Sequence, residues 1–209
     1  MTSLVLFAVA WSSLSHVLVD GVAAKCAPPA RMLSIDLDQS GIRWKGTKFW
    51  GLGSHEGTVQ LTGGEMCVLN GRIVGGTFVA DMNTIVVTDI PESEPVPRRR
   101  LRDHLLSENF FHVSAHPEAR LTLRSVEREE RALHRVEADL TMRGRTRRVT
   151  FYARVWTLNN EEVSAEAVLK VDRHRWGVSY RGSTIRDDLV DDDFSLFLTV
   201  RAAPGVATM

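Results

Sequence analysis

Residues 53–85, GSHEGTVQLTGGEMCVLNGRIVGGTFVADMNTI, decide the fold of this chain. Apolar and polar residues alternate along the stretch, and this alternation places successive side chains on opposite faces of a β-strand. Asn70-Gly71 separates two such runs and is a strong signal for a two-residue β-hairpin turn. Thr62-Gly63-Gly64 is expected to form a second turn. The stretch therefore predicts antiparallel strands joined by tight turns.

The same alternation continues on both sides of this stretch. Three prolines after residue 89 interrupt it, because proline cannot occupy a central strand, and residues 98–107 then carry leucines at helical spacing. Short connections between the strands favour antiparallel neighbours. We predict an up-and-down barrel of eight or more strands with a short helix covering one end; a β-sandwich is the alternative. The further candidate strands are 31–38, 42–48, 120–127, 133–143, 148–158, 162–171 and 193–202.

Composition bounds the class of protein. The 209 residues suit one sizeable domain, and the formal net charge is zero because 26 basic side chains balance 26 acidic ones. Nucleic-acid-binding domains usually have a basic surface, so we expect no nucleic-acid partner. Arginines cluster at 98–102 and 143–148 and aspartates at 187–193, where we expect solvated turns or rims.

The N-terminus is expected to be separate from the fold. An apolar run at residues 4–19 precedes Val22-Ala23-Ala24, which fits cleavage of a signal peptide before Lys25. A membrane anchor is the alternative. We therefore predict a signal peptide at residues 1–24 and a barrel domain at 25–209. Export would permit a disulfide between Cys26 and Cys67, but the sequence leaves open whether these cysteines pair or stay free.

Small residues recur on the apolar faces of several expected strands. A barrel of about eight strands is filled by large side chains, whereas smaller ones can leave a cavity for one ligand. Tapered packing of a solid barrel would give the same pattern. The small residues are Ala80, Ala138, Ala153, Ala165 and Ala167.

Several short motifs, in order, resemble the YceI-like family, the lipocalin-like isoprenoid-binding proteins. The resemblance covers about residues 31–202. The matching pieces are SHEGTV (54–59), GGTF (75–78) running into DMNTI (81–85), Leu101 with HL (104–105), SENFF (107–111), PEA (117–119), ADLTMRG (138–144) with Thr146, DR (172–173) and WG (176–177).

This resemblance implies an all-β, lipocalin-like antiparallel barrel of eight strands with a short helix over one end and a long apolar tunnel. It implies a periplasmic or secreted protein that binds, stores or transports a long-chain apolar lipid without being an enzyme. The lipid would be a polyisoprenoid, an isoprenoid quinone or a fatty-acid amide. No metal or cofactor is expected beyond a bound lipid such as a polyprenol or isoprenoid quinone. Transient membrane contact and a homodimer are further expectations.

The predicted ligand site is a stripe of apolar side chains on the inner barrel face, with a lid formed by the helix and the two phenylalanines after it. Plain core packing is the alternative for each residue, and a register error of one residue would turn the stripe outward. His55 would hold a head group or brace a loop. The predicted ligand-binding residues are His55, Phe78, Ala80, Met82, Leu101, Leu105, Phe110, Phe111, Leu140, Met142, Phe151, Val155, Leu169 and Trp176.

Other functions have weaker support. The sequence lacks Gly-x-Ser-x-Gly, a glycine-rich phosphate loop and HExxH, and we predict no catalytic residue. His112 and His116 lack a third ligand at metal-site spacing. Arg173 is expected to pair with Asp172 near Trp176. Two alternatives remain: a stress-related or structural interaction protein with a packed barrel, and a hydrolase acting on a lipid head group at the barrel mouth.

Overall fold

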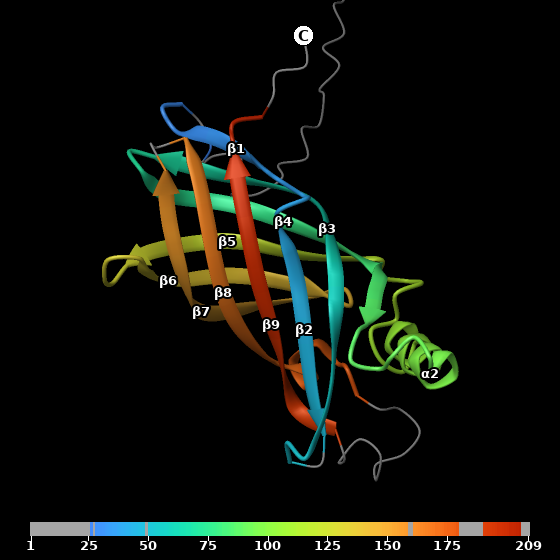
Figure 1. The fold of residues 1–209 in the computed structure, drawn as a ribbon. Coiled ribbons are helices and arrows are strands. Elements are labelled where there is room, and N and C mark those ends of the chain that lie inside the picture. The colour runs from blue at the N-terminus through green and yellow to red at the C-terminus, as the bar shows by residue number, and fades with distance from the viewer. Residues whose placement is uncertain (1–25, 27, 49, 159–160, 180–189, 206–209) are drawn as a thin grey trace, which may run out of the picture.

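The computed structural model describes residues 26, 28–48, 50–158, 161–179 and 190–205. These residues form nine antiparallel strands, one α-helix and one short 3₁₀ helix (Figure 1). The predicted signal peptide at 1–24 and a turn expected at Asn159-Asn160 lie outside the described residues. The elements are β1 (Arg31–Ile35), β2 (Gly41–Lys48), β3 (Gly53–Leu69), β4 (Arg72–Val87), α2 (Pro95–Leu106), β5 (Glu118–Arg128), β6 (Leu133–Met142), β7 (Arg145–Leu158), β8 (Glu162–Asp172), η1 (Arg173–Trp176) and β9 (Val190–Ala203).

The strands close into a barrel with eight positions. Their order is β1-β3-β2-β9-β8-β7-β6-β5-β4, and β3 also pairs with β4 to close the ring. β1 and β2 share one position between β3 and β9, because β1 pairs with residues 65–68 of β3 whereas β2 pairs with residues 53–59. The predicted eight-stranded antiparallel barrel is therefore confirmed, and the sandwich is excluded.

The hairpin turns show where local sequence was sufficient. Asn70 and Gly71 have φ angles of 50° and 72°, as a tight two-residue turn requires, and this predicted turn is confirmed. The turn predicted at residues 62–64 is wrong, because β3 runs through it with a register shift. Gly64 permits a close approach instead: a Cβ there would lie 2.8 Å from both Ile35 Cγ1 and the Thr77 carbonyl oxygen.

Helix α2 begins earlier than predicted. The predicted helix covers residues 98–107, whereas Pro95 and Pro97 already lie in the first turn of α2, where the missing proline N–H leaves no bond unmade. Arg98 Nε donates to the Val87 carbonyl oxygen at 2.8 Å and Arg102 Nε to that of Ile85 at 3.1 Å. β5 pairs only with residues 77–81 of β4. The two arginines therefore bond backbone carbonyl oxygens in the part of β4 that β5 does not cover, and they do not form the solvated rim that was expected.

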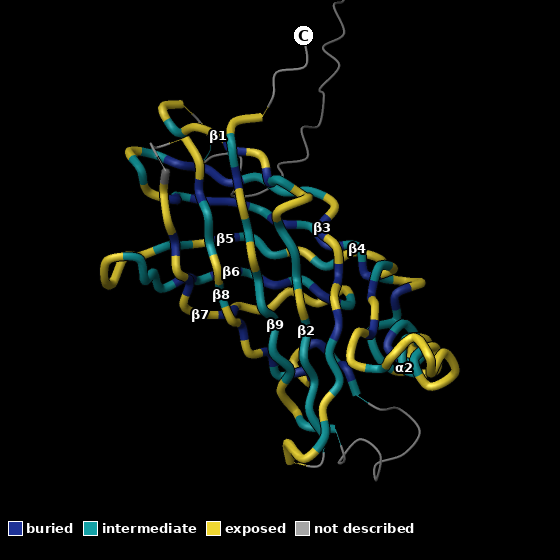
Figure 2. The backbone as a smooth tube through the Cα atoms, viewed as in Figure 1, coloured by how far each residue is buried: buried dark blue, intermediate teal, exposed yellow. Residues whose placement is uncertain are grey.

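The two faces of the sheet differ in chemistry, and Figure 2 shows exposed residues concentrated on the outer tips and α2. The apolar core fills the barrel interior. Outside, Asp139 accepts hydrogen bonds from Arg124 Nε at 2.6 Å and Arg148 Nε at 2.7 Å. Burial raises the pKa of Asp139, but the hydrogen bonds from these arginines outweigh it and hold that pKa below its usual value.

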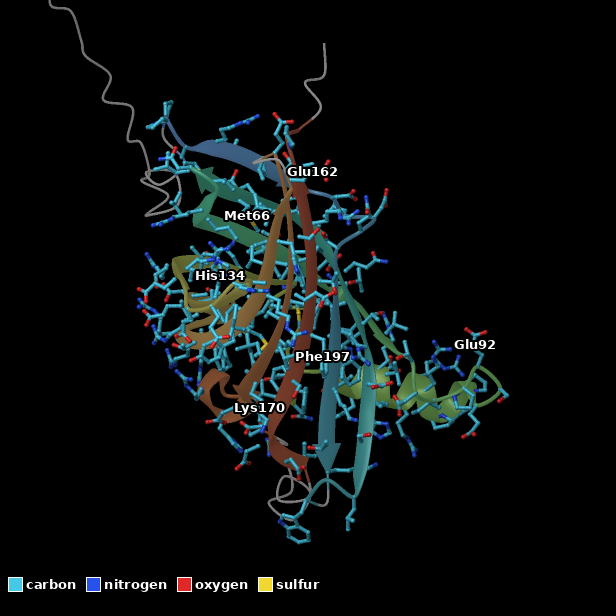
Figure 3. All side chains as sticks on the ribbon, turned by 60° about the vertical axis from the view of Figure 1, so that its left-hand side comes forward. Met66, Glu92, His134, Glu162, Lys170 and Phe197 are labelled. Carbon is cyan, nitrogen blue, oxygen red and sulfur yellow. A yellow bond between two sulfur atoms is a disulfide. The ribbon has the colours of Figure 1, made fainter. Side chains whose placement is uncertain are left out.

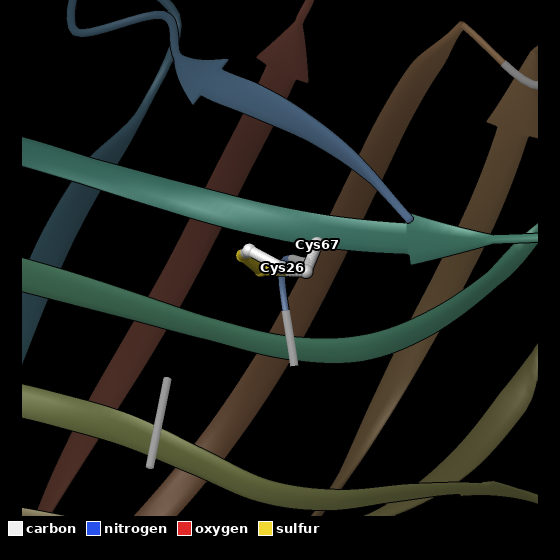
Figure 4. Close-up of a disulfide and its surroundings, with 2 residues drawn as sticks. All are labelled: Cys26 and Cys67. Atoms are coloured by element: carbon white, nitrogen blue, oxygen red, sulfur yellow. A yellow bond between two sulfur atoms is a disulfide. The ribbon is translucent and has the colours of Figure 1, made fainter. Parts of the chain in front are cut away.

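Cys26 and Cys67 form a disulfide with a Cα–Cα distance of 5.2 Å (Figure 4). The bond settles the question that the sequence left open. It closes a loop with a sequence separation of 41 residues, for which chain entropy alone provides about 4 kcal/mol of stabilisation. The bond fastens the start of the described chain to β3. No helix in the described ranges has the length and apolar character needed to cross a membrane.

Candidate ligand cavity

A cavity of about 180 Å³ lies inside the barrel. Every barrel strand from β2 to β9 contributes to its wall, together with α2 and the segment that follows it. In Figure 3, Met66 marks the upper part of this wall, and Lys170, whose neighbour Leu169 lines the cavity, lies toward the lower end. Most of the wall is apolar because the inward face of the strands carries mainly apolar residues.

All but three of the predicted ligand-binding residues lie in this wall. The period-two pattern therefore assigned the inward face in the correct register. Their contact with a ligand stays a prediction. The predicted residues in the wall are Phe78, Ala80, Met82, Leu105, Phe110, Phe111, Leu140, Met142, Phe151, Val155 and Leu169.

His55 lies outside the wall and braces two chain segments. Its Nδ1 is 2.8 Å from Asp89 Oδ2, and its Nε2 is 3.2 Å from Lys48 Nζ. Asp89 also accepts a hydrogen bond from the Glu56 backbone at 3.0 Å. Burial raises the pKa of Asp89, but the bonds from Glu56 and His55 outweigh this effect, so its pKa lies below the usual value.

Leu101 and Trp176 also lie outside the wall. Leu101 packs against the apolar core from α2. Trp176 is fully buried in η1, and its Nε1 donates to the Leu140 carbonyl oxygen at 3.1 Å. The cation over its ring is Arg175, at 5.4 Å from the ring centroid.

Of the residues predicted to form the lid, Leu105, Phe110 and Phe111 line the cavity and Leu101 does not. Phe110 and Phe111 meet edge to face with ring centroids 4.8 Å apart, and Phe111 reaches Phe194 of β9 at 6.2 Å. His104 of α2 packs against Phe110 at 5.3 Å, and burial lowers the pKa of this imidazole. The chain after α2 thus crosses the end of the barrel and contacts the opposite strand.

The family model described as a YceI-like domain matches residues 33–202. The chain belongs to the YceI-like family. No curated protein sequence matches it. Burkholderia cenocepacia BcnA has a similar structure, with a TM-score of 0.63, 15% identity and coverage of 81% of this chain and 99% of that one.

Two further solved structures share this YceI-like fold. A polyisoprenoid-binding domain from Saccharophagus degradans, implicated in plant cell wall breakdown, has a TM-score of 0.60 and 15% identity over 83% of this chain and 98% of that one. The Campylobacter jejuni YceI protein has a TM-score of 0.51 and 17% identity over 65% of this chain and 75% of that one. At these identities the likeness establishes the fold.

The predicted site had no residue on three strands that line the cavity of this YceI-like barrel, β2, β5 and β9; Leu121 and Leu123 line it from β5. Ile42 and Trp44 of β2 line the cavity, as do Phe194, Leu196 and Leu198 of β9. Polar Arg43 separates Ile42 from Trp44, and polar Ser195 separates Phe194 from Leu196, so the period-two signal was present in both stretches, although apolar Phe197 interrupts it before Leu198.

The lower end of the cavity is polar. Thr47, Arg173, Asp191 and Asp193 line it. The hydroxyl of Thr47 donates to the Asp191 carboxylate, which also accepts the backbone N–H of Trp50 at 3.0 Å. This carboxylate therefore ties the β2–β3 hairpin to the start of β9.

Arg173 is a buried side chain that holds this end together. Its guanidinium donates to the carbonyl oxygens of Val178 and Val190, both at 3.1 Å. Its ion-pair partner is Asp192 at 3.7 Å, not the predicted Asp172, whose carboxylate accepts the His174 backbone N–H at 2.9 Å. Arg173 therefore joins η1 to β9.

The cavity has a smaller volume than the long tunnel expected from the family resemblance. Its volume of about 180 Å³ is close to the roughly 150 Å³ cavity that admits benzene and below the roughly 300–1,000 Å³ of drug-sized sites. A longer chain enters only when wall side chains move. Met66, Met82 and Met142 line the cavity, and methionine adapts its shape readily because it is unbranched.

Proposed function

We propose that this protein binds a long-chain apolar lipid inside the barrel and stores or carries it unchanged. The candidates are a polyisoprenoid, an isoprenoid quinone and a fatty-acid amide. The apolar cavity carries the proposal, because its wall, formed by side chains of eight strands and the segment after α2, takes hydrocarbon out of water. Membership of a family with a polyisoprenoid-binding member supports the ligand class. A solid, packed barrel would have no such cavity.

The energetics agree with a binding role. Each buried CH₂ contributes about 0.8 kcal/mol, so a chain of moderate length gains enough to offset the cost of ordering it. Asp89, His104 and Asp139 have displaced pKa values, and all three lie outside the cavity wall. The proposed role is therefore binding rather than chemistry on a head group.

We also propose a periplasmic or secreted location. The Cys26–Cys67 disulfide supports it, because such bonds persist in oxidising compartments. A homodimer stays a prediction, which light scattering of the purified protein would test.

Lipid extraction tests the main proposal. Protein purified from its native host should release a long-chain lipid into organic solvent, identified by mass spectrometry. Ala167→Phe should abolish this release, because Ala167 lines the cavity. Val168→Phe should not, since Val168 is the next residue of β8 and is exposed on the outer face. Wild-type preparations that release no lipid, or equal release from Ala167→Phe, would contradict the proposal.

Transient membrane contact would occur at the tip between β2 and β3. Trp50 and Leu52 are 87% and 88% exposed there, and Trp50 is bonded to Asp191 at the polar end of the cavity. Tryptophan favours the membrane–water interface, so this tip would place the cavity end against a bilayer.

Flotation with phosphatidylcholine vesicles tests this contact. Trp50→Ser combined with Leu52→Ser should reduce the vesicle-bound fraction. Val96→Ser should leave the vesicle-bound fraction unchanged. Val96 is also exposed and apolar, but it lies on α2 and not at the tip between β2 and β3. Equal flotation of the double variant and the wild type would exclude the tip as the contact.

A further inference from the structure

Trp44 occupies a special place in the cavity wall. It lies on β2 opposite Gly57 of β3 and Leu196 of β9. Its indole covers Gly57, since a Cβ added to that glycine would lie 2.7 Å from Cζ2 and 2.8 Å from Cε2. A residue without a side chain on β3 therefore makes room for the largest side chain on β2.

The indole N–H of Trp44 has no hydrogen-bond partner. Within the described ranges, Trp44 Nε1 is the buried side-chain nitrogen or oxygen left in this state. An unsatisfied buried donor costs about 1–3 kcal/mol. The N–H of Trp176, in contrast, has the Leu140 carbonyl oxygen as its acceptor. The protein thus carries an unmet donor in the wall of its apolar cavity.

Water is a poor partner for this donor. A buried water needs two to four polar partners, whereas Trp44 is paired with Gly57 and Leu196 in the sheet and its neighbour in the cavity wall on β2 is Ile42. Arg120 lines the cavity from β5, and the other charged residues of the cavity lie beyond Phe194, which pairs with Gly46. A water bound to the Trp44 N–H would therefore make one hydrogen bond and leave its other hydrogen-bonding groups without partners.

We propose that Trp44 Nε1 donates a hydrogen bond to a carbonyl oxygen of the bound lipid. The inference rests on the proposed lipid-binding function and specifies its ligand class as a ketone, such as a quinone carbonyl, or an ester. A carbonyl brings an acceptor and no donor. A hydroxyl or amide would satisfy Trp44 but bury its own O–H or N–H among apolar residues, at a further cost.

The location predicts how the lipid lies. Trp44 is three residues from Thr47 at the polar end, or about 10 Å along the strand. The carbonyl therefore lies inside the barrel, and the apolar tail extends toward Met66. Because Nε1 is buried in the ligand-free protein, the proposed bond requires that the side chains moved by the entering lipid include those covering the indole edge.

Three matched probes test this bond: decane, the corresponding methyl ketone and the corresponding secondary alcohol. Each is titrated into delipidated wild-type protein and Trp44→Phe. In the wild type the ketone should bind more tightly than the alcohol. Trp44→Phe should weaken ketone binding about fivefold to tenfold, the effect of one hydrogen bond, and change decane binding less than about twofold. Decane binding also verifies that the variant is folded and its cavity intact.

An NMR measurement on the wild type checks the same bond without relying on the variant. The ¹⁵N-labelled indole signal of Trp44, identified by its absence from Trp44→Phe, should move downfield with ketone and stay near its free position with decane. Equal ketone affinity in both proteins, or an unmoved Trp44 signal in the ketone complex, would overturn the carbonyl assignment while leaving lipid binding intact. Failure of all three probes to bind the wild type would overturn both proposals.

Discussion

Trp44 and Trp176 carry the same side chain in two regions of one barrel. Trp176 is fully buried at the end of η1, its N–H donates to Leu140, and Arg175 lies over its ring. Trp44 lines the cavity, and its N–H has no partner. Both rings fill space, but only Trp44 keeps an unmet polar group. The hydrogen bonds of the two indoles separate them: the N–H of the fully buried Trp176 has an acceptor, and that of the half-buried Trp44 has none.

Gly57, the glycine that the Trp44 indole covers, should be the position where substitution lowers stability most. A Cβ at Gly57 would lie 1.7 Å from the Val86 carbonyl oxygen as well as against the indole. Gly57→Ala should lower the free energy of unfolding by about 3 kcal/mol, measured by urea denaturation. Gly63→Ala on the same strand is the control, because its Cβ would meet nothing within 4 Å. Equal stability of the two variants would refute this account of Gly57.

Replacing Trp176, whose N–H has a hydrogen-bond acceptor, should cause the next largest loss of stability. Trp176→Phe removes buried volume and the donor to Leu140, so it should destabilise the fold by about 2 kcal/mol. Its affinity for decane should match the wild type, since Trp176 is outside the cavity wall. Trp156→Phe, at a residue 42% exposed, is the control and should be nearly silent in the same denaturation experiment.

Replacing Trp44, whose N–H has no acceptor, should raise the stability of the ligand-free protein instead of lowering it. Trp44→Phe removes a buried donor without a partner, so the ligand-free protein should gain about 1 kcal/mol of stability. Urea denaturation of delipidated protein would measure this gain. A loss as large as that of Trp176→Phe would show that Trp44 is a packing residue, and the contrast between the two tryptophans would disappear.

The smallest effect should come from the cation over Trp176. Arg175 lies 5.4 Å from the ring centroid and also donates to the Arg148 carbonyl oxygen at 2.9 Å. Arg175→Gln should cost about 0.5–1 kcal/mol, as for an exposed cation–π contact. Thermal unfolding would detect the change. A loss equal to that of Trp176→Phe would mean that the arginine, rather than the N–H, holds this ring.

Much of the barrel could be predicted because its signal is local. Alternation assigned Phe78, Ala80 and Met82 to the inner face, since only one face of a strand can pack inside. The double glycine at Gly63-Gly64 was misjudged because glycine serves turns and close approaches alike. Choosing between these uses required Ile35 and Thr77, which lie far from the glycines in sequence but adjacent to Gly64 in the fold.

The sequence by itself determined the strands, the hairpin at Asn70-Gly71 and the apolar inner face, because each depends on neighbouring residues in one chain segment. Tertiary structure alone decided the Cys26–Cys67 bond, the size of the cavity and the isolation of the Trp44 N–H. These features depend on what other strands bring to the same point. A donor lacks a partner only when every surrounding strand fails to supply an acceptor, and no local pattern records that.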